Sequence, residues 1–428
     1  MPSMMQVLVQ TAYSLLTLAV QPLLRLKLAR RARREPSYGQ AIAERFGRYS
    51  QAAQPAADLL WIHAVSLGEA RAAGILLRVL REQRPGLRVL LTHGTATGRA
   101  EGRRLMREGD VQVWQPWDTE QATARFLDHF RPTLGVLMET EVWPNLVRAA
   151  GSRGVPLVLA NARLSERSFR QAMRWSWLAR PAYSALSAVW AQTEEDAHRL
   201  RAIGAPVQAV LGNLKFDARP DDAQRQRAAQ LRPGLKRPVL MFASSREGEE
   251  ALLLKALQTL PQPWPFDLLI VPRNPQRFDE VGALLAGAGY SVWRRSQAGD
   301  DLSLWPASAG TVRLGDSLGE MALYSSLASF ALLGESFLPL GGQNLIEAAA
   351  CGCPVIVGPH TFNFSEVAER AIEEGAACRV SDIDYALRQA CDWAQDAQGP
   401  ERSRRALEFA QRHRGSAQAT AERLLAWY

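Results

Sequence analysis

The chain has 428 residues, of which 47% are hydrophobic and 22% are charged, and its formal net charge is +8. This length exceeds what one ordinary core fills and predicts two domains of about 200 residues each, while the composition excludes a disordered or low-complexity chain. The excess of positive charge predicts anionic partners, which include nucleic acid, a phospholipid surface and a phosphorylated substrate.

The first segment, residues 1–24, carries no charged side chain and predicts one membrane-spanning helix of about 20 residues, although Gln10, Gln21 and Pro22 weaken the apolar run. A helix that lies in the membrane interface is the alternative. Positive charge directly after the segment predicts a body on the cytoplasmic side. The same placement argues against nucleic acid as a partner, because the basic residues do not interleave with stacking aromatic residues. These basic residues are Arg25, Lys27, Arg30, Arg31, Arg33 and Arg34.

Short apolar segments then alternate with amphipathic ones as far as residue 211. This alternation is typical of a doubly wound α/β fold with a parallel sheet. The first strand begins at Leu59, and later strands are predicted at residues 87–92, 111–114, 134–138, 157–160, 188–191 and 207–211. Helices are predicted at residues 96–106, 120–130, 142–150, 165–178 and 194–203.

A polar segment after residue 212 indicates a linker, and the alternation then begins again. The sequence therefore predicts two Rossmann-like domains that face a central cleft. Strands are predicted at residues 239–243, 268–271, 312–314, 327–333 and 355–357, and helices at 249–260, 277–288, 319–324 and 344–350. The predicted divisions are an anchor with its basic flank at 1–34, domains at 35–217 and 218–399, and a closing helix at 400–428 that packs back on the first domain.

Glu69 follows the first strand in the stretch Ser66-Leu67-Gly68-Glu69, which opens a helix. Ligands bind at the carboxyl edge of open α/β sheets, and a carboxylate at a helix start can accept a proton. Glu69 is therefore a candidate general base, with Ser66 and Gly68 as candidate acceptor-binding residues. A simple helix-capping role for Glu69 is the alternative that spacing alone favours.

Two further carboxylates, Glu139 and Glu141, follow the strand at residues 134–138 and face the same cleft. Two carboxylates at one edge are typical of an acid/base pair, although one of the two is expected to be structural. We rank Glu69 above Glu139 as the catalytic residue and assign Glu141 to acceptor binding.

The second domain contains several residue types that bind a nucleotide. Ser244, Ser245 and Arg246 lie between a strand and a helix start, where N–H groups and the helix dipole favour a phosphate. Arg273 and Asn274 follow the next strand, and a guanidinium there can form paired hydrogen bonds with the same phosphate. The third set is Gly342, Asn344 and Glu347. Asn344 and Glu347 are predicted to share a helix face from which a carboxylate accepts from both ribose hydroxyls, with helix capping as the alternative.

These stretches resemble the 3-deoxy-D-manno-octulosonic acid (Kdo) transferases of lipopolysaccharide synthesis, which have the two-domain GT-B glycosyltransferase fold. The matching stretches are WIHAVSLGE at 61–69, METEVWPN at 138–145, GNLKFD at 212–217, VPR at 271–273 and GPHTFNF at 358–364. The resemblance implies the donor CMP-Kdo, the acceptor lipid IVA and an N-terminal anchor in the cell inner membrane. It also places the general base on Glu69.

Four positions depart from the family pattern. Arg246, Asn274 and Gln343 stand where the family often has His, and Ala348 stands where it often has Pro. These replacements bear on the contacts with the donor phosphate and leave Glu69, Arg273 and Glu347 in place.

The predicted reaction is an inverting transfer of Kdo from CMP-Kdo to a hydroxyl of lipid IVA. Glu69 takes the proton, while Arg273 and the helix start at Ser244 and Ser245 stabilise the departing CMP. No cofactor is predicted, and no metal ion, because the stretches assigned to the donor contain no Asp-x-Asp motif that would hold one between donor phosphates. The alternatives are a GT-B enzyme that uses a UDP-sugar on another lipid-linked acceptor, and a membrane-tethered nucleotide-binding protein without catalysis.

Overall fold

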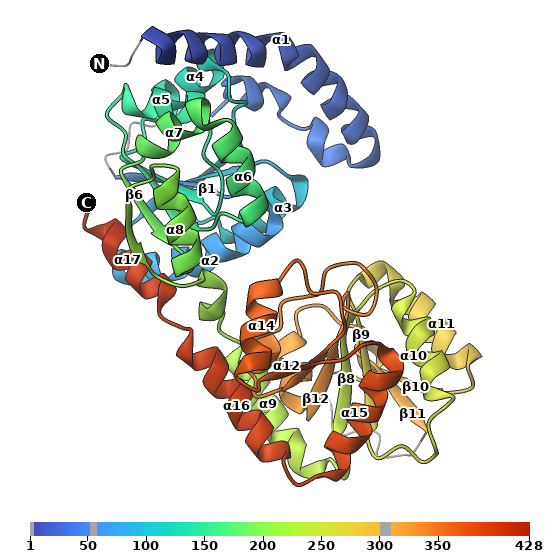
Figure 1. Cartoon of the computed structure of the whole chain (residues 1–428). Helices are drawn as coiled ribbons and strands as arrows, with labels where there is room; N and C mark the ends of the chain where they lie inside the picture. The colour runs from blue at the N-terminus through green and yellow to red at the C-terminus, as the bar shows by residue number, and fades with distance from the viewer. Residues whose placement is uncertain (1–3, 52–57, 300–309) are drawn as a thin grey trace. The chain divides into compact units, whose positions relative to one another are not determined.

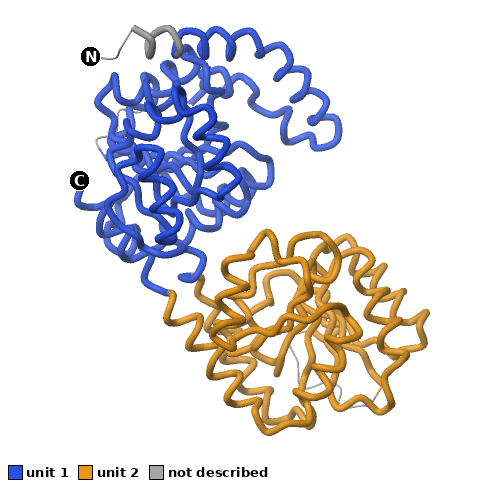
Figure 2. Tube along the Cα trace, viewed as in Figure 1, with its two compact units in different colours: residues 1–217, 414–428 blue, residues 218–413 orange. Residues whose placement is uncertain are grey.

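The structure is a computed structural model, and it describes residues 4–51, 58–299 and 310–428. The chain forms two compact units (Figure 2). Unit 1 comprises residues 1–217 and 414–428, and unit 2 comprises residues 218–413. The last fifteen residues therefore belong to the same unit as the N-terminal half of the chain.

Unit 1 is built on a parallel sheet of seven strands in the order β3-β2-β1-β4-β5-β6-β7 (Figure 1). Alternate residues of β1 face opposite sides: Trp61 lies in one buried apolar cluster and Ile62 in the other. Helices cover both faces, as an all-parallel sheet requires. The strands are β1 (Leu59–His63), β2 (Arg88–His93), β3 (Val111–Trp114), β4 (Leu134–Met138), β5 (Leu157–Ala162), β6 (Ala188–Ala191) and β7 (Val207–Val210).

The helices of unit 1 mostly join successive strands. Five of them start with a side-chain cap of the expected kind, such as Thr119, whose hydroxyl accepts from the N–H of Ala122. They are α1 (Met4–Arg34), α2 (Leu67–Gln83), α3 (Ala96–Leu105), α4 (Glu120–Phe130), α5 (Pro144–Gly151), α6 (Glu166–Arg174), α7 (Ser176–Ser184), α8 (Glu194–Ala202) and α17 (Ser416–Leu425), with short 3-10 helices η1 (Pro36–Gly39), η2 (Ile42–Phe46) and η3 (Leu214–Asp217).

Unit 2 repeats the plan with seven parallel strands in the order β10-β11-β9-β8-β12-β13-β14. Its core is a cluster of buried apolar residues that includes Phe242, Ile270 and Leu332 on three adjacent strands. The strands are β8 (Val239–Ser245), β9 (Asp267–Pro272), β10 (Ser291–Arg294), β11 (Thr311–Leu314), β12 (Phe330–Leu333), β13 (Val355–Val357) and β14 (Ala377–Arg379).

In unit 2, helix α9 follows the first junction with unit 1, at residue 218, and helix α16 ends just before the second, at residue 413. The helices of unit 2 are α9 (Asp222–Leu231), α10 (Glu249–Leu257), α11 (Phe278–Gly287), α12 (Met321–Leu327), α13 (Ile346–Ala349), α14 (Ser365–Glu373), α15 (Ile383–Gln395) and α16 (Gly399–Arg412), with short 3-10 helices η4 (Arg232–Gly234), η5 (Pro275–Arg277) and η6 (Arg295–Gln297).

Each sheet reverses its direction of growth beside its first strand. The reversal lies between β1 and β4 in unit 1 and between β8 and β12 in unit 2. At such a switch point the connections leave to opposite sides and open a crevice at the carboxyl ends of the strands, which is where open α/β sheets bind ligands. Both sheets therefore place their candidate site residues at the edge that the sequence predicts.

Several elements differ from the sequence prediction. Residues 165–178 form two helices, α6 and α7, because the backbone of Trp175 leaves the helical conformation. Residues 400–428, for which the pattern predicts one closing helix, form α16 and α17, and Gly415 between them adopts a left-handed φ of 108°. Strand β12 starts only at Phe330, after the end of α12.

The N-terminal helix α1 is docked on unit 1 by polar side chains. The Ser14 hydroxyl donates to Oδ1 of Asn145 (2.9 Å), which also accepts from Nε2 of Gln10 (3.2 Å). The Tyr13 hydroxyl donates to Oδ2 of Asp118 (2.8 Å). Residues 1–3 of the predicted membrane segment lie outside the described residues. No helix in the described part of the chain has both the length and the apolar character for crossing a bilayer.

Candidate active site

Glu69 lies in the first turn of α2, three residues after the cap residue Ser66. Its Oε2 accepts from the N–H of Val65 (2.8 Å), and its Oε1 accepts from the hydroxyl of Ser66 (2.7 Å). The same hydroxyl accepts from the N–H of Glu69 (3.3 Å). Ser66 therefore caps α2, and the Glu69 carboxylate returns to the cap hydroxyl and to the N–H of the residue before the cap, so Glu69 takes part in the helix cap.

The Glu69 side chain is also buried, with only 8% of the residue exposed. Burial raises the pKa of Glu69 above its usual range, the bonds from Ser66 and Val65 partly offset that rise, and the charge of Glu139 adds to it. A carboxylate with a raised pKa is a stronger base than one in water. The capped carboxylate therefore has the electrostatic property that a general base requires.

Glu139 directly follows β4 and is the second acidic residue at the switch point. Its backbone is left-handed, with a φ of 57°, which is uncommon for a residue other than glycine. Its carboxylate forms ion pairs with Nζ of Lys215 (3.2 Å) and Nε of Arg163 (3.0 Å). Two cations thus hold this carboxylate at the edge of the sheet.

Glu141 lies two residues further along, and no cation among the described residues forms an ion pair with it as close as those of Glu139. Its Oε2 accepts from Nε1 of Trp143 (2.8 Å) and lies 4.0 Å from Nε2 of His63. Burial and then the charge of Glu69 raise the pKa of Glu141 to about 7, whereas burial and the neighbouring His93 lower the pKa of His63 to about 3. Near neutral pH, His63 is uncharged and Glu141 is partly protonated.

The three glutamates therefore occupy one edge but differ in their partners. Glu139 is paired with cations, Glu69 is held by hydrogen bonds, and Glu141 is partly protonated near neutral pH. Glu69 and Glu141, whose pKa values are both raised, are suited to moving a proton to or from a bound hydroxyl. Within the described ranges, no group of three His, Cys, Asp or Glu side chains is arranged to hold a metal ion.

The two small residues predicted to bind an acceptor also lie at this edge. The Ser66 hydroxyl is engaged by Glu69, so its first role is to orient that carboxylate. A Cβ built on Gly68 meets only Oγ of Ser66, at 3.9 Å. Packing within the chain therefore does not demand glycine at position 68, and the position can admit close approach of a ligand.

Sequence reasoning missed the partners that position these carboxylates. Lys215 lies 76 residues from Glu139 in the chain, and Arg163 lies beyond the next strand. Lys215 belongs to the GNLKFD stretch that carried the resemblance, and this was the one available signal. His63 ends β1 inside the first quoted stretch, but nothing in its spacing identified Glu141 as its neighbour.

In unit 2, the three predicted phosphate-binding residues lie at a bulge where β8 ends. Ser244 has a left-handed φ of 57°, and the register with β9 shifts at this residue. The Ser245 hydroxyl donates to Oε1 of Glu250 (2.8 Å), and the N–H of Arg246 donates to Oε2 of Glu249 (3.0 Å). These two donors point into the protein, so the predicted phosphate cradle needs other groups.

Arg273 and Asn274 lie where the sequence predicts, at the carboxyl end of β9 beside the bulge. The N–H of Arg273 donates to the carbonyl of Ser245 (2.9 Å), which joins the two strand ends. Asn274 immediately precedes η5. The structure therefore brings Arg273, Asn274 and the Ser244–Arg246 turn together at adjacent strand ends.

The third donor set corrects one prediction. Helix α13 begins at Ile346, so Asn344 precedes the helix and does not share a helix face with Glu347. Oδ1 of Asn344 instead accepts from the N–H of Ile346 (3.1 Å) in the turn before α13, whose cap position is Leu345. Gly342 has a φ of 76°, and its N–H donates to the carbonyl of Glu335 (2.8 Å).

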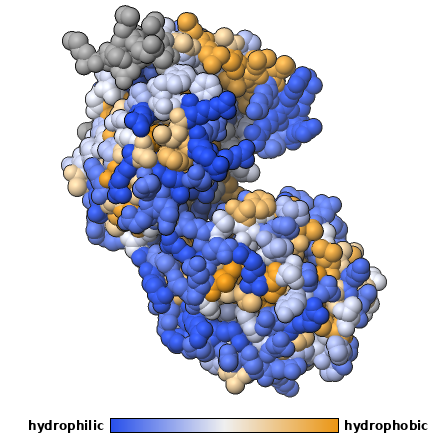
Figure 3. Space-filling view, viewed as in Figure 1, coloured by the Kyte–Doolittle hydropathy of each residue, from blue (hydrophilic) through white to orange (hydrophobic). Residues whose placement is uncertain are grey.

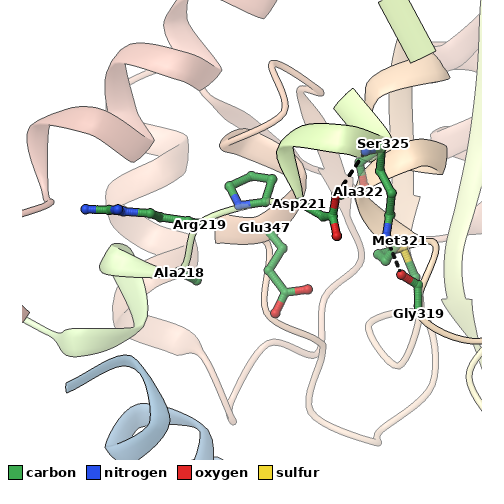
Figure 4. Close-up of a pocket in the computed structure, with 10 residues that line it drawn as sticks. Ala218, Arg219, Asp221, Gly319, Met321, Ala322, Ser325 and Glu347 are labelled. Atoms are coloured by element: carbon green, nitrogen blue, oxygen red, sulfur yellow. Dashed lines mark hydrogen bonds between the residues drawn. The ribbon is translucent and has the colours of Figure 1, made fainter. Parts of the chain in front are cut away.

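Glu347 is exposed and lines a pocket of about 360 Å³ within unit 2 (Figure 4). The start of α9 and the first turns of α12 form the other walls, and the amide of Gln224 joins them by donating to the carbonyl of Gly319 (2.7 Å). The carboxylate of Glu347 is thus accessible from the pocket, as a ribose-binding group must be.

Two Rossmann-like units, each with polar residues at its switch point, are the architecture of the GT-B fold. The solved structure of UDP-GlcNAc 2-epimerase from Neisseria meningitidis bound to UDP-GlcNAc shares this fold, with a TM-score of 0.54 over 86% of this chain and 99% of that chain. At 15% sequence identity it supports the fold alone.

Sequence relationships identify the family. The model described as 3-deoxy-D-manno-octulosonic-acid transferase (kdotransferase) matches residues 40–218. The 3-deoxy-D-manno-octulosonic acid transferase of Bordetella pertussis is 45% identical over 97% of this chain and 98% of that protein. Its counterpart in Haemophilus influenzae is 34% identical over 89% of each. The chain therefore belongs to the Kdo transferase family of glycosyltransferases.

Proposed function

We propose that this chain transfers Kdo from CMP-Kdo to lipid IVA, with inversion at the anomeric carbon, in lipopolysaccharide synthesis. Unit 1 binds the acceptor and unit 2 binds the donor. The observation that carries the proposal is the buried, hydrogen-bonded carboxylate of Glu69 at the switch point of unit 1, in a chain that matches its family over almost its whole length.

In the proposed reaction, Glu69 takes the proton from the attacking hydroxyl of the acceptor. The acceptor oxygen forms a bond to the anomeric carbon of Kdo, and the bond from that carbon to the phosphate oxygen of CMP breaks. The raised pKa of Glu69 favours the proton transfer, while Ser66 and Val65 keep the carboxylate in one orientation. Glu139 is fixed by Lys215 and Arg163, and in this proposal it provides charge and shape.

On the donor side, we assign the phosphate to the edge formed by Arg273, Asn274 and the Ser244–Arg246 turn. Arg246 forms an ion pair with Glu335 (3.3 Å) and is half exposed, so its guanidinium can turn toward an anion. Glu347 accepts from the ribose hydroxyls in the pocket of Figure 4. The guanidinium groups stabilise the negative charge that develops on departing CMP.

Helix α1 has two faces, and these support attachment in the membrane interface. The residues at positions 10, 13, 14, 24 and 28 face the protein, while Leu15, Leu16 and Leu23 are 60–66% exposed. Apolar side chains gather along this helix and basic ones at its end (Figure 3). An exposed apolar stripe with a basic flank fits a helix that lies at the surface of an anionic bilayer. We assign the surface to the cytoplasmic side of the inner membrane, where an acylated acceptor and a cytosolic CMP-sugar meet.

The assignment of the reaction is tested with purified protein, CMP-Kdo and lipid IVA, with products resolved by mass spectrometry. We expect a product that is heavier by one or more Kdo residues and depends on CMP-Kdo. Parallel reactions contain UDP-glucose or UDP-GlcNAc in place of CMP-Kdo. Transfer from a UDP-sugar but not from CMP-Kdo would overturn the donor assignment, and an absence of transfer with clear CMP binding would favour a non-catalytic role.

The membrane assignment is tested by flotation with vesicles that contain anionic phospholipid. A variant that combines Leu15→Ser, Leu16→Ser and Leu23→Ser should lose most vesicle binding without a change in melting temperature, because these side chains are exposed. Leu318→Ser is the matched control, since Leu318 is 74% exposed in unit 2. Unchanged flotation of the triple variant would reject α1 as the attachment.

A further inference from the structure

Two adjacent glutamates, Glu249 and Glu250, open α10 and have no part in the mechanism above. Both residues are 0% exposed. An ionised carboxylate is costly to bury unless donors surround it. Their partners therefore indicate what the two side chains do.

Glu249 accepts three backbone N–H groups that belong to two different strand ends. Oε2 accepts from Arg246 in the loop after β8 (3.0 Å) and from Glu335 in the loop after β12 (2.8 Å), and Oε1 accepts from Phe337 (3.3 Å). Burial raises the pKa of Glu249, and the bonds from these backbone groups partly offset the rise. One carboxylate thus joins the two loops on either side of the switch point of unit 2.

The two loops that Glu249 joins contain backbone conformations that need support. Ser244 and Glu335 have left-handed φ values of 57° and 61°. A Cβ on Gly334 would lie 2.3 Å from the carbonyl oxygen of Ser244, so only glycine permits this approach of the two strand ends. Strained residues of this kind persist only where their surroundings fix them, and they occur often at ligand sites.

Glu250 acts on a different pair of elements. Its carboxylate accepts from Nη1 and Nη2 of Arg277 (2.8 and 3.2 Å) and from the hydroxyl of Ser245. It therefore joins the end of β8 to η5, away from β12. The two glutamates have equal burial and adjacent positions but hold different loops.

We propose that Glu249 is a positioning residue of the donor site, which sets the spacing of the loops after β8 and β12 and does not itself touch the donor. The inference rests on the proposed function, in which CMP binds at this edge. This role also explains why the N–H of Arg246 does not point toward a donor phosphate: it donates to the Glu249 carboxylate. Donor phosphate must then be bound by side chains such as Arg273 and Arg246.

The first test compares Glu249→Gln with Glu250→Gln by calorimetry with CMP and by kinetics. Glutamine keeps the size of the side chain but turns an NH2 group toward an N–H donor. We expect Glu249→Gln to weaken CMP binding about tenfold or more and to raise the KM for CMP-Kdo with the KM for lipid IVA unchanged. Folded Glu249→Gln with CMP affinity within twofold of wild type would overturn the inference.

The second test needs no variant and remains decisive if Glu249→Gln does not fold. Hydrogen exchange is measured on the wild-type chain for the amides of Arg246, Glu335 and Phe337, with and without CMP. We expect strong protection without CMP and little change on its addition. Fast exchange that CMP suppresses would show that these amides bind the phosphate directly. Wild-type chain that does not bind CMP would refute the donor assignment, while the exchange without CMP would still report on Glu249.

Discussion

The switch points of the two units both place a glutamate in the first turn of the helix after the first strand, but the two side chains face different partners. Glu69 accepts from Val65 and Ser66 within its own loop, and its edge carries two more carboxylates. Glu249 accepts from the loops of two strands and shares its helix start with Glu250. The same position at a helix start thus leaves the Glu69 carboxylate with local partners, whereas the Glu249 carboxylate joins the loops after β8 and β12. What distinguishes the two is the number of donors that come from distant parts of the chain.

The largest expected effect comes from Glu69→Gln, which removes the proton affinity and keeps the shape. Glutamine also suits this position of a capping box, so the melting temperature should change little. Turnover should fall about a hundredfold or more, measured with saturating CMP-Kdo and lipid IVA. If turnover is near normal, Glu69 only caps α2, and both Glu69 and Glu249 are structural residues. Glu82→Gln, which changes an exposed glutamate near the other end of α2, is the matched control.

The next effect concerns Glu347, which represents the exposed polar groups of the donor edge. Glu347→Ala should weaken CMP binding by roughly 1.5–3 kcal/mol, the scale of hydrogen bonds to a charged group, and calorimetry gives this value directly. The change should not affect stability, because the side chain is exposed. Unchanged affinity would place the ribose elsewhere. Glu366→Ala is a suitable control, because it removes an exposed glutamate from α14.

A pH-dependent effect is expected at Glu141, since its pKa is raised to about 7 in the folded chain. The folded state then binds the proton more tightly than the unfolded state, so stability falls as pH rises from about 4.5 to about 7 and stays low above that range. Glu141→Gln lacks this dependence and should be more stable than wild type at pH 8 by on the order of 2 kcal/mol, with little difference at pH 4. Denaturant unfolding at both pH values measures this, with exposed Glu82→Gln as control. An equal difference at both pH values would contradict the raised pKa.

The smallest expected effect is that of Tyr13→Phe, which removes the hydroxyl that donates to Asp118. Asp118 also accepts from the N–H groups of Asn145 and Leu146, and these begin α5 directly after the loop with Glu139 and Glu141. The edge of unit 1 is therefore supported from outside by α1, whereas the edge of unit 2 is supported by its own glutamates. We expect a loss of about 1 kcal/mol in unfolding free energy. No loss would mean that α1 does not contribute to this edge, and Tyr385→Phe in unit 2 is the control.

Much of the fold could be predicted from sequence because buried parallel strands are short apolar runs. The bounds of β3, β4 and β13 are those predicted, as are the bounds of α4. The weaker segments were missed: β10 and β14 are edge strands of four and three residues and have few apolar side chains. The start of α13 was placed too early, because Asn344 lies in the turn that precedes the helix.

The site was predictable in position but not in detail. Candidate residues could be assigned to strand ends, because the alternation of strands and helices fixes which loops share an edge. The partners of Glu139 and Glu249 lie 76 and 86 residues away, and no local pattern encodes such pairs. Gln10 was one of the residues that weakened the predicted membrane helix, and in the structure it donates to Asn145. The neighbouring Tyr13 and Ser14, which the prediction did not single out, bind Asp118 and Asn145.

The return of the C-terminus to unit 1 sets the order in which this chain can be completed during synthesis. Ala417, Ala421 and Leu424 of α17 are buried in the same core cluster as Leu77 and Leu214, and Asp217 accepts from the N–H groups of Gly415 and Ala417. The last part of this core leaves the ribosome about 200 residues after residue 217, a delay of roughly 10–40 s. A nascent chain that ends at residue 217 therefore exposes the apolar surface that α17 later covers. An exchange of units between two members of the family must transfer residues 414–428 together with residues 1–217, or it will join two halves of different cores.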